Sequence, residues 1–555
     1  MATSKPRSRS LPRRVITVAV VFLLLLVVSW FVIAGISWRR DRVVKYDLLA
    51  DWNGSFSGDP LDQRSWPVLR DSIVELSSRI PGTEPGPDVA FSGSWHAGRL
   101  QELGLHAGLH DGMTDPGSMD TAIRDLEDSG VSSLGMTPEA LRAWYLEQQP
   151  VLQRIRAGLE RPHLGAFYEL NPPSDPADRI FMLEPAERLA YEQINWAGQP
   201  ALFPSIELPL PLLSPLRHLA IFLVGDATLA ASAGDGARAV ADFRALHRLA
   251  SQLNDRQTMI EQLVGSAILT LAIQSERRLL ATYPQSFTND DLETLARVLA
   301  ASRADGMRLE LQGERDVFRD LVQRLYSDDG QGDGVYMARH AAGLALLAQG
   351  TGGGLTAGVF GTVLEPVFGM LVPKRREAMD LHGAYMDMLF ETSTTPLHDI
   401  DWDQCDLMVA CVTPKSSGTL AALETFPVNL LASPPPDSIV HWHLQAAEQA
   451  ANEVIVALLR YQRLEGVWPK TLEALVPEYL ASVPLDCYDG TPLKYAVRDG
   501  RPLLWSVGAN RTDESARVPA ASAGSDAAAR VFERPDALSK AAPGDWILWR
   551  GPDSR

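Results

Sequence analysis

The sequence predicts a mainly α-helical protein with an N-terminal transmembrane helix, a body of stacked α-helical hairpins and a small C-terminal α+β module. Three observations favour this fold. Uncharged residues run from Val15 to Trp38, apolar residues recur at helical spacing within 211–435, and apolar alternation with turn signals follows Pro484. Because 555 residues exceed what one hydrophobic core holds, we expect several domains.

The composition is typical of a folded protein, since 46% of the residues are apolar and 22% are charged. The net charge is −18; residues 1–45 carry nine Lys/Arg against one Asp, so the remaining chain accounts for −26. Such a surface repels phosphate backbones, and we expect no nucleic-acid binding. Cys405, Cys411 and Cys487 lack the spacing of zinc or redox sites. Separate thiols are expected, with a Cys405–Cys411 disulfide as the alternative.

Residues 15–38 predict a transmembrane helix that follows a basic tail at 1–14. As a helix this run is about 36 Å long, enough to cross a hydrocarbon core of about 30 Å. Gly35-Ile36-Ser37 is a poor cleavage site, so an uncleaved anchor is favoured. Five basic residues precede the run and four follow it, which makes the charge bias small. We expect a single-pass protein of the bacterial inner membrane, with most of the chain outside the cytoplasm.

Residues 46–210 are rich in Pro and Gly and predict an irregular helical region. Its clearest helices cover about 65–80 and 137–160. The second begins with Thr137 as N-cap and Pro138 at the first helical position.

Residues 211–435 predict the helical body. Helices are expected over about 214–233, 237–253 and 258–281, and a fourth begins at Thr288, where Asp290 and Asp291 complement the helix dipole. Short polar turns imply antiparallel neighbours. The first pair loosely resembles one tetratricopeptide hairpin, although no strict repeat is present. Stacks of this kind usually supply binding surfaces.

Three segments of the body allow sharper readings. Ser327–His340 has the first half of an EF-hand spacing, but His340 stands where the closing Glu is needed, so a solvated turn is predicted. His398–Asp406 alternates carboxylates with bulky residues, and an exposed loop is predicted in preference to a strand. The uncharged, Gly-rich residues 341–364 predict a packed helical hairpin, with a second membrane span as the alternative.

No local catalytic motif is present: the chain has no G-x-S-x-G, no H-E-x-x-H and no paired Cys/His cluster. His441 and His443 are expected to pack at the beginning of the helix that follows them.

The C-terminal module, 438–555, begins with a helix over about 444–464 that Gly466 ends. A short helix is expected from Pro469. Two strands separated by the Asp499-Gly500 turn and a third at 545–549 complete a three-stranded antiparallel sheet. Alternation predicts that three strand residues face the helix at Val454 and Leu458, namely Leu503, Trp505 and Val507.

In this order of elements, residues 444–550 resemble the globular domain of major pseudopilins, the type II secretion protein G family. The matching positions are Asp486, Gly490, Pro492 and Tyr495, then Trp505, Ser506, Gly508 and Ala509, then Asp545 and Trp546. Cys487 replaces a proline of the family pattern, and Asn510-Arg511 stands where Asp-Gly is usual. The anchor lacks the pilin Gly-Phe-Glu pattern, so polymerisation as a pilin is not expected.

The resemblance implies a calcium loop in the module. Asp513, Glu514 and Asp545 are the carboxylates that can bind calcium here, while Arg511 opposes a cation. We therefore expect a module that folds without calcium. No other cofactor is expected.

The leading functional expectation is a non-enzymatic, single-pass envelope protein that binds other proteins, linked to a type II secretion or pilus-like assembly. The alternative is a membrane-anchored enzyme, hydrolytic or metal-dependent. Its site would be assembled from distant residues of the body, such as the acidic cluster at Asp399–Asp406.

Overall fold

The computed structural model describes the chain in segments, which are residues 24, 28–30, 41–79, 138–170, 175, 177–178, 203–208, 210–305, 309–337, 371–412, 427–428, 437–516 and 545–552. The predicted anchor lies outside these segments except for Leu24 and Val28–Trp30, which are helical. Thr137 and the Gly-rich run 341–364 also lie outside them. Among the helices of the described residues, none is both long and apolar enough to cross a membrane.

The body begins with three successive antiparallel helices, as predicted. They are α9 (Leu213–Ser232), α10 (Gly236–Asn254) and α11 (Met259–Thr282), joined by short turns. The N-cap Asp235 accepts a hydrogen bond from the amide of Arg238, and a reciprocal capping box of Thr258 and Glu261 begins α11. These caps satisfy amides that have no partner inside the helix, which fixes where each helix begins.

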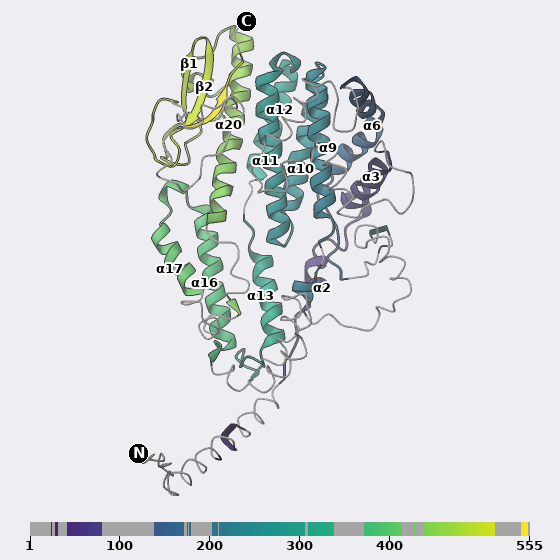
Figure 1. Ribbon diagram of the computed structural model, residues 1–555, viewed down its shortest axis with the longest axis vertical. Coiled ribbons are helices and arrows are strands. Elements are labelled where there is room, and N and C mark those ends of the chain that lie inside the picture. Colours follow the sequence, from purple (N-terminus) through teal and green to yellow (C-terminus); the bar gives the residue numbers. More distant parts are fainter. Residues whose placement is uncertain are drawn as a thin grey trace, which may run out of the picture.

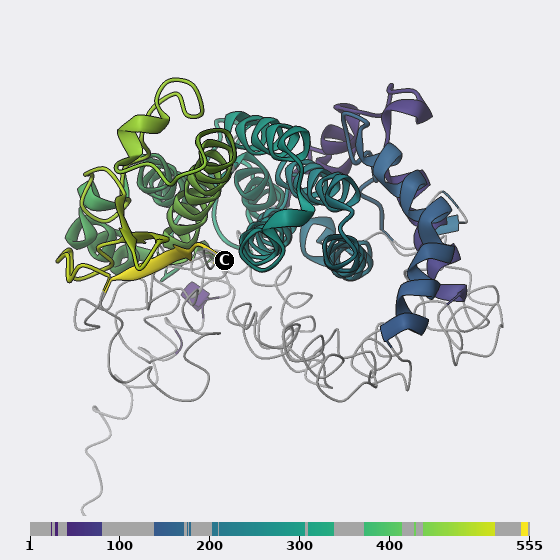
Figure 2. The same cartoon turned by 90° about the horizontal axis from the view of Figure 1, so that it is seen from above.

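Two later helices convert this hairpin stack into a four-helix bundle. After η3 (Pro284–Ser286), α12 (Asn289–Asp305) packs against α10, and α20 (Asp437–Glu465) packs against both α11 and α12. Figures 1 and 2 show α20 beside the body although it comes more than 130 residues after α12. The arrangement therefore differs from a linear tetratricopeptide stack, because α10, α11, α20 and α12 form a ring.

Further helices cover two sides of the bundle. On one side, α3 (Trp66–Ser78) and α6 (Pro138–Leu159) pack together and α6 contacts α9 and α10. Below the bundle in Figure 1, a second core joins α13 (Gln312–Leu325), α16 (Arg375–Thr394) and α17 (Trp402–Val412). The remaining short elements are α2 (Leu48–Gly54), η1 (Leu61–Gln63), α8 (Pro204–Glu207), η4 (Leu397–Asp399) and η5 (Leu472–Leu475).

The C-terminal sheet is the predicted antiparallel one, in the order β1 (Lys494–Arg498), β2 (Arg501–Ser506), β3 (Trp546–Arg550). Asp499 and Gly500 have φ of 51° and 78°, the conformation of a two-residue hairpin turn. Gly466, at φ 74°, ends α20 as expected. One face of the sheet packs on α20 through Leu504, Trp546 and Trp549 within the main core.

The predicted facing of Trp505 is wrong. Leu504 shares the main core with Val454 and Leu458, whereas Leu503 and Trp505 form a separate cluster with Ile547 on the opposite face. Trp505 is still buried, at 5% exposure, because Ala516 and Ile547 pack against it on that face. Consecutive apolar residues in β2 make both faces apolar, so alternation alone does not select the inner one.

Other local predictions have mixed outcomes. The short helix expected from Pro469 is only the 3₁₀ turn η5. The helix α20 begins at Asp437, earlier than predicted, so His443 lies within it and contacts the carbonyl of Thr392 at 3.1 Å. Cys405, Cys411 and Cys487 are free thiols, as favoured.

In the acidic segments after Ser327 and near Asp399, carboxylates accept hydrogen bonds from backbone amides of the same segment. The predicted turn after Ser327 is confirmed: the Asp329 carboxylate accepts the amides of Gln331 and Asp333. The carboxylates near Asp399 lie in η4 and the first turns of α17, where Asp401 caps the amide of Gln404, and neither a strand nor a plain loop forms.

Candidate functional site: an arginine-lined pocket above a buried polar cluster

A pocket of about 220 Å³ lies between α10 and α12. Each wall is a stripe of side chains at helical spacing, so the two helices present their facing surfaces to the same space. Three arginines give the pocket its character. The lining consists of Arg244, His247 and Arg248 from α10, with Thr294, Arg297, Val298, Ala301 and Ser302 from α12.

The arginines are partly engaged at the pocket rim. Arg244 forms an ion pair with Glu160 at 2.6 Å, and Arg297 donates to the Thr294 hydroxyl at 3.1 Å. Both contacts are exposed, and the Arg244–Glu160 ion pair contributes little to stability, so Arg244 can exchange Glu160 for another anion. On a chain with net charge −18, three arginines around one pocket form a local site for a negatively charged group.

Beneath the pocket, each helix of the bundle contributes a polar side chain to one cluster. His247 of α10 contacts Ser302 of α12 through Nδ1 at 2.8 Å and Glu276 of α11 through Nε2 at 2.7 Å. Asn452 of α20 donates to the second Glu276 oxygen at 2.9 Å. Glu276 and Asn452 are fully buried and His247 is 4% exposed. The cluster therefore joins four helices at their centre.

The cluster satisfies its polar groups internally. Arg277 donates to the Asn452 amide oxygen at 3.1 Å and to the Glu448 carbonyl at 3.2 Å. Gln449 donates to the Ser302 hydroxyl at 2.9 Å. One assignment that satisfies both contacts has the Nε2–H of His247 donating to Glu276 and the Ser302 hydroxyl donating to Nδ1. Buried networks of this kind specify one packing arrangement.

Ser302, His247 and Glu276 are thus connected in the order of a nucleophile, base and orienting acid. Ser302 and His247 both line the pocket, whereas Glu276 does not. A hydrolase also needs donors for the developing oxyanion. The amide of Ser302 lies inside α12, where it is used by the helix, so it is not available as such a donor.

A second buried charge cluster lies between α6, α9 and α10. Arg156 contacts Asp242 and Asp226 at 2.6 Å and 2.5 Å, and both carboxylates are fully buried. Burial raises the pKa of Asp242 well above its usual value, while Arg156 opposes this rise. The cluster joins α6 to α9 and α10, and its role is structural.

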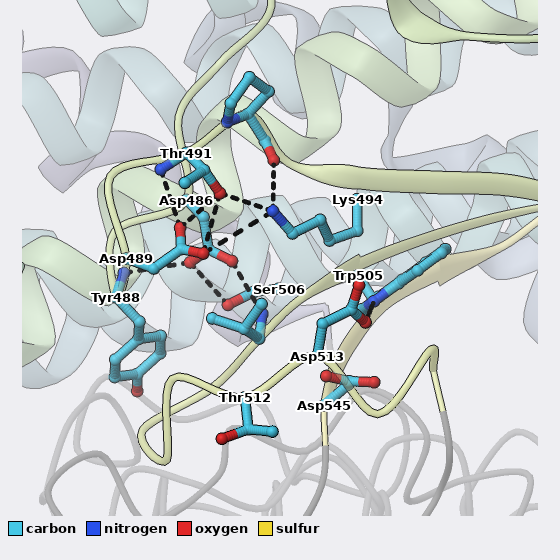
Figure 3. A network of polar contacts seen from close by, with 12 residues as sticks. Asp486, Tyr488, Asp489, Thr491, Lys494, Trp505, Ser506, Thr512, Asp513 and Asp545 are labelled. Carbon is cyan, nitrogen blue, oxygen red and sulfur yellow. Dashed lines mark hydrogen bonds and ion pairs between the residues drawn. The ribbon is translucent and has the colours of Figure 1, made fainter.

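In the C-terminal module, Asp486 is the centre of a polar network (Figure 3). Its carboxylate accepts the Ser506 hydroxyl at 2.8 Å, the Tyr488 amide at 3.0 Å and the Val507 amide at 2.8 Å. Asp486 is 1% exposed, and burial raises its pKa, against these hydrogen bonds. This residue fixes the loop before β1 to the end of β2, which is a structural role.

The proposed calcium ligands lie in the same region but are occupied by donors. Asp545 accepts the amides of Glu514 at 3.2 Å and Ala516 at 2.5 Å, and Asp513 accepts the Trp505 indole at 3.0 Å (Figure 3). Asn510 donates to Glu514 at 2.7 Å. Within the described segments, no group of three or more His, Cys, Asp or Glu is placed to hold a metal ion. Folding of the module without calcium stays a prediction.

Sequence reasoning missed His247, Glu276 and Ser302, which lie in three helices. The sequence signal is weak, because His247 and Glu276 are only two of several polar residues on the buried surfaces of α10 and α11. The acidic cluster at Asp399–Asp406, named as a site for an enzyme, is exposed at Asp399, Asp401, Asp403 and Asp406 and is far in sequence from the pocket. Comparisons with family models, curated proteins and solved structures find no match to this chain.

Proposed function

We propose that this chain is a non-enzymatic, single-pass envelope protein whose helical body binds a partner protein, with the α10–α12 pocket receiving an acidic side chain or terminal carboxylate. The arginine-lined pocket is the observation that carries this proposal. The anchor and the link to a type II secretion or pilus-like assembly rest on the sequence, through residues 15–38 and the pseudopilin-like module.

The size of the pocket favours a single docked group over a whole substrate. Sites for drug-sized ligands usually measure about 300–1,000 Å³. The pocket here measures about 220 Å³, which suits one side chain and its carboxylate. Arginine recognises carboxylates through paired donors, so a partner that presents Asp, Glu or a C-terminus fits best.

A photo-crosslinking experiment tests this. A photoreactive residue replaces Val298 in the full-length protein, which is then irradiated in its native membranes and purified. We expect a discrete crosslinked partner that is lost when Arg248→Glu and Arg297→Glu are added. The matched control is Arg142→Glu, an exposed arginine of α6, which leaves the crosslink intact. A crosslink unaffected by reversal of the pocket charges contradicts the proposal.

The second candidate is the membrane-anchored hydrolase, which the Ser302–His247–Glu276 connection favours. In that reaction, Ser302 Oγ attacks an ester carbonyl while His247 Nδ1 takes the hydroxyl proton, the alcohol leaves, and water then releases the acid. It ranks second because the Ser302 amide is used within α12 and no other backbone oxyanion donor is identified among the described residues of the lining.

A fluorophosphonate probe separates the two candidates. The binding function predicts no labelling of the full-length protein. Labelling that Ser302→Ala removes, with the melting temperature unchanged, would favour the hydrolase.

A further inference from the structure

A carboxylate of the chain itself reaches the rim of the α10–α12 pocket. Glu160 follows Leu159, the last residue of α6, and its Oε2 lies 2.6 Å from Nη2 of Arg244, which lines the pocket. The two side chains are 84 positions apart in the chain. The carboxylate that the pocket is proposed to receive therefore has an intramolecular counterpart on one of the arginines of the lining.

Both members of this ion pair are open to solvent. The side chain of Arg244 is 49% exposed and that of Glu160 is 40% exposed, so a carboxylate in solution can reach the arginine. An exposed ion pair shifts an equilibrium by at most about five-fold, since water and salt screen it. The contact can therefore be exchanged for another at little cost.

The backbone that carries Glu160 is fixed by contacts that do not involve its carboxylate. Leu159 is fully buried. The side-chain amide of Gln252 in α10 bridges the two neighbouring peptide groups, because its Nε2 lies 3.3 Å from the Leu159 carbonyl and 2.7 Å from the Arg161 carbonyl. The Glu160 side chain can therefore leave Arg244 while its backbone stays in place.

The contact on the other wall of the pocket is of a different kind. Arg297 donates to the Thr294 hydroxyl at 3.1 Å, and this neutral acceptor places no negative charge beside the arginine. A carboxylate that arrives between α10 and α12 therefore competes with Glu160 for Arg244, whereas the Arg297–Thr294 contact opposes it with no charge. The strength of carboxylate binding then depends on Glu160.

We infer that Glu160 is an internal competitor that determines the affinity and selectivity of the pocket: a ligand carboxylate binds Arg244 by displacing the carboxylate of Glu160. A neutral amide of the same shape offers no ion pair to Arg244, so it does not displace Glu160 and binds more weakly. This inference rests on the carboxylate-binding function proposed above, and it names the residue that sets the strength of that binding.

The test uses full-length protein and the probe N-trifluoroacetylglycine, whose carboxylate resembles a chain terminus and whose ¹⁹F signal reports binding. Glu160→Gln removes the competing charge and keeps the shape of the side chain. It should lower the dissociation constant of the probe by about two- to five-fold, the effect of one exposed ion pair. The neutral N-trifluoroacetylglycinamide should bind equally weakly to both proteins. An unchanged or higher dissociation constant of the carboxylate in Glu160→Gln would overturn the inference.

Two controls separate direct competition from the general effect of removing one negative charge. Glu147→Gln removes an exposed carboxylate from the same helix, α6, and should leave the dissociation constant of the probe unchanged. In an Arg244→Gln background, Glu160→Gln should have no effect, because the two carboxylates then have no arginine to compete for. An equal gain from Glu147→Gln, or a gain that persists without Arg244, contradicts direct competition.

The same titrations distinguish this inference from the function proposed for the pocket. Carboxylate binding that Arg248→Glu abolishes and that Glu160→Gln leaves unchanged would retain the carboxylate site and refute the internal competitor. A carboxylate that binds no more tightly than the amide, in the wild type and in Glu160→Gln, would contradict both.

Discussion

Replacing Asp486 by alanine tests whether one buried carboxylate holds the C-terminal module together. The wild-type side chain accepts hydrogen bonds from the Ser506 hydroxyl and the amides of Tyr488 and Val507. Alanine leaves these two amides buried without a partner, at about 1–3 kcal/mol each. The carboxylate itself is costly to bury, as its raised pKa indicates, and this offsets part of the loss. We expect a net local destabilisation of about 3 kcal/mol.

Hydrogen exchange followed by mass spectrometry on the full-length chain measures this local destabilisation. When opening is fast and reversible, 3 kcal/mol raises the exchange rate of the affected amides by about 100-fold. The increase should appear in peptides from β2 and not in those from α9. Asp486→Asn is the matched control: it keeps one oxygen acceptor and should show a clearly smaller increase. If β2 exchanges equally in Asp486→Ala and wild type, the network does not stabilise the sheet.

Deleting residues 1–40 should release the protein from membranes in a sedimentation assay; a truncated chain that still sediments contradicts a single N-terminal anchor. His382→Phe should make the free energy of unfolding less sensitive to low pH. Burial lowers the pKa of His382 to about 3. The contribution of its neutral form to the free energy of unfolding is therefore fully present above pH 6.5 and falls by about 1.4 kcal/mol per pH unit below it. Phenylalanine keeps the stacking on Phe318. Urea unfolding at pH 7.5 and pH 5 measures the effect, and an equal loss of unfolding free energy in the variant and the wild type would contradict this prediction. Melting curves in millimolar calcium and in chelator should coincide, and a calcium-dependent rise that Asp513→Ala abolishes would reveal a metal site.

Features that depend on neighbouring residues were predictable from the sequence. Asp499-Gly500 forms the hairpin turn because both positions need positive φ, which these residues tolerate. Thr288 begins α12 through a reciprocal pair with Asp291, at 2.8 Å and 3.2 Å. Gly466 ends α20 because the position has a φ of 74°, which glycine adopts without steric cost. In each case the chemistry and the partner lie within a few residues of one another.

The sequence by itself determined the helical body, the three-stranded sheet and most helix ends, because periodicity and caps are local. Only the tertiary structure decided which face of β2 meets α20, since Leu503, Leu504 and Trp505 make both faces apolar. It also decided the candidate site. His247 and Asn452 belong to helices far apart in the chain, and their connection through Glu276 exists only because α20 completes the ring with α10, α11 and α12. Residues that meet only because distant helices pack together have no fixed spacing in the sequence, so no sequence motif identifies this site.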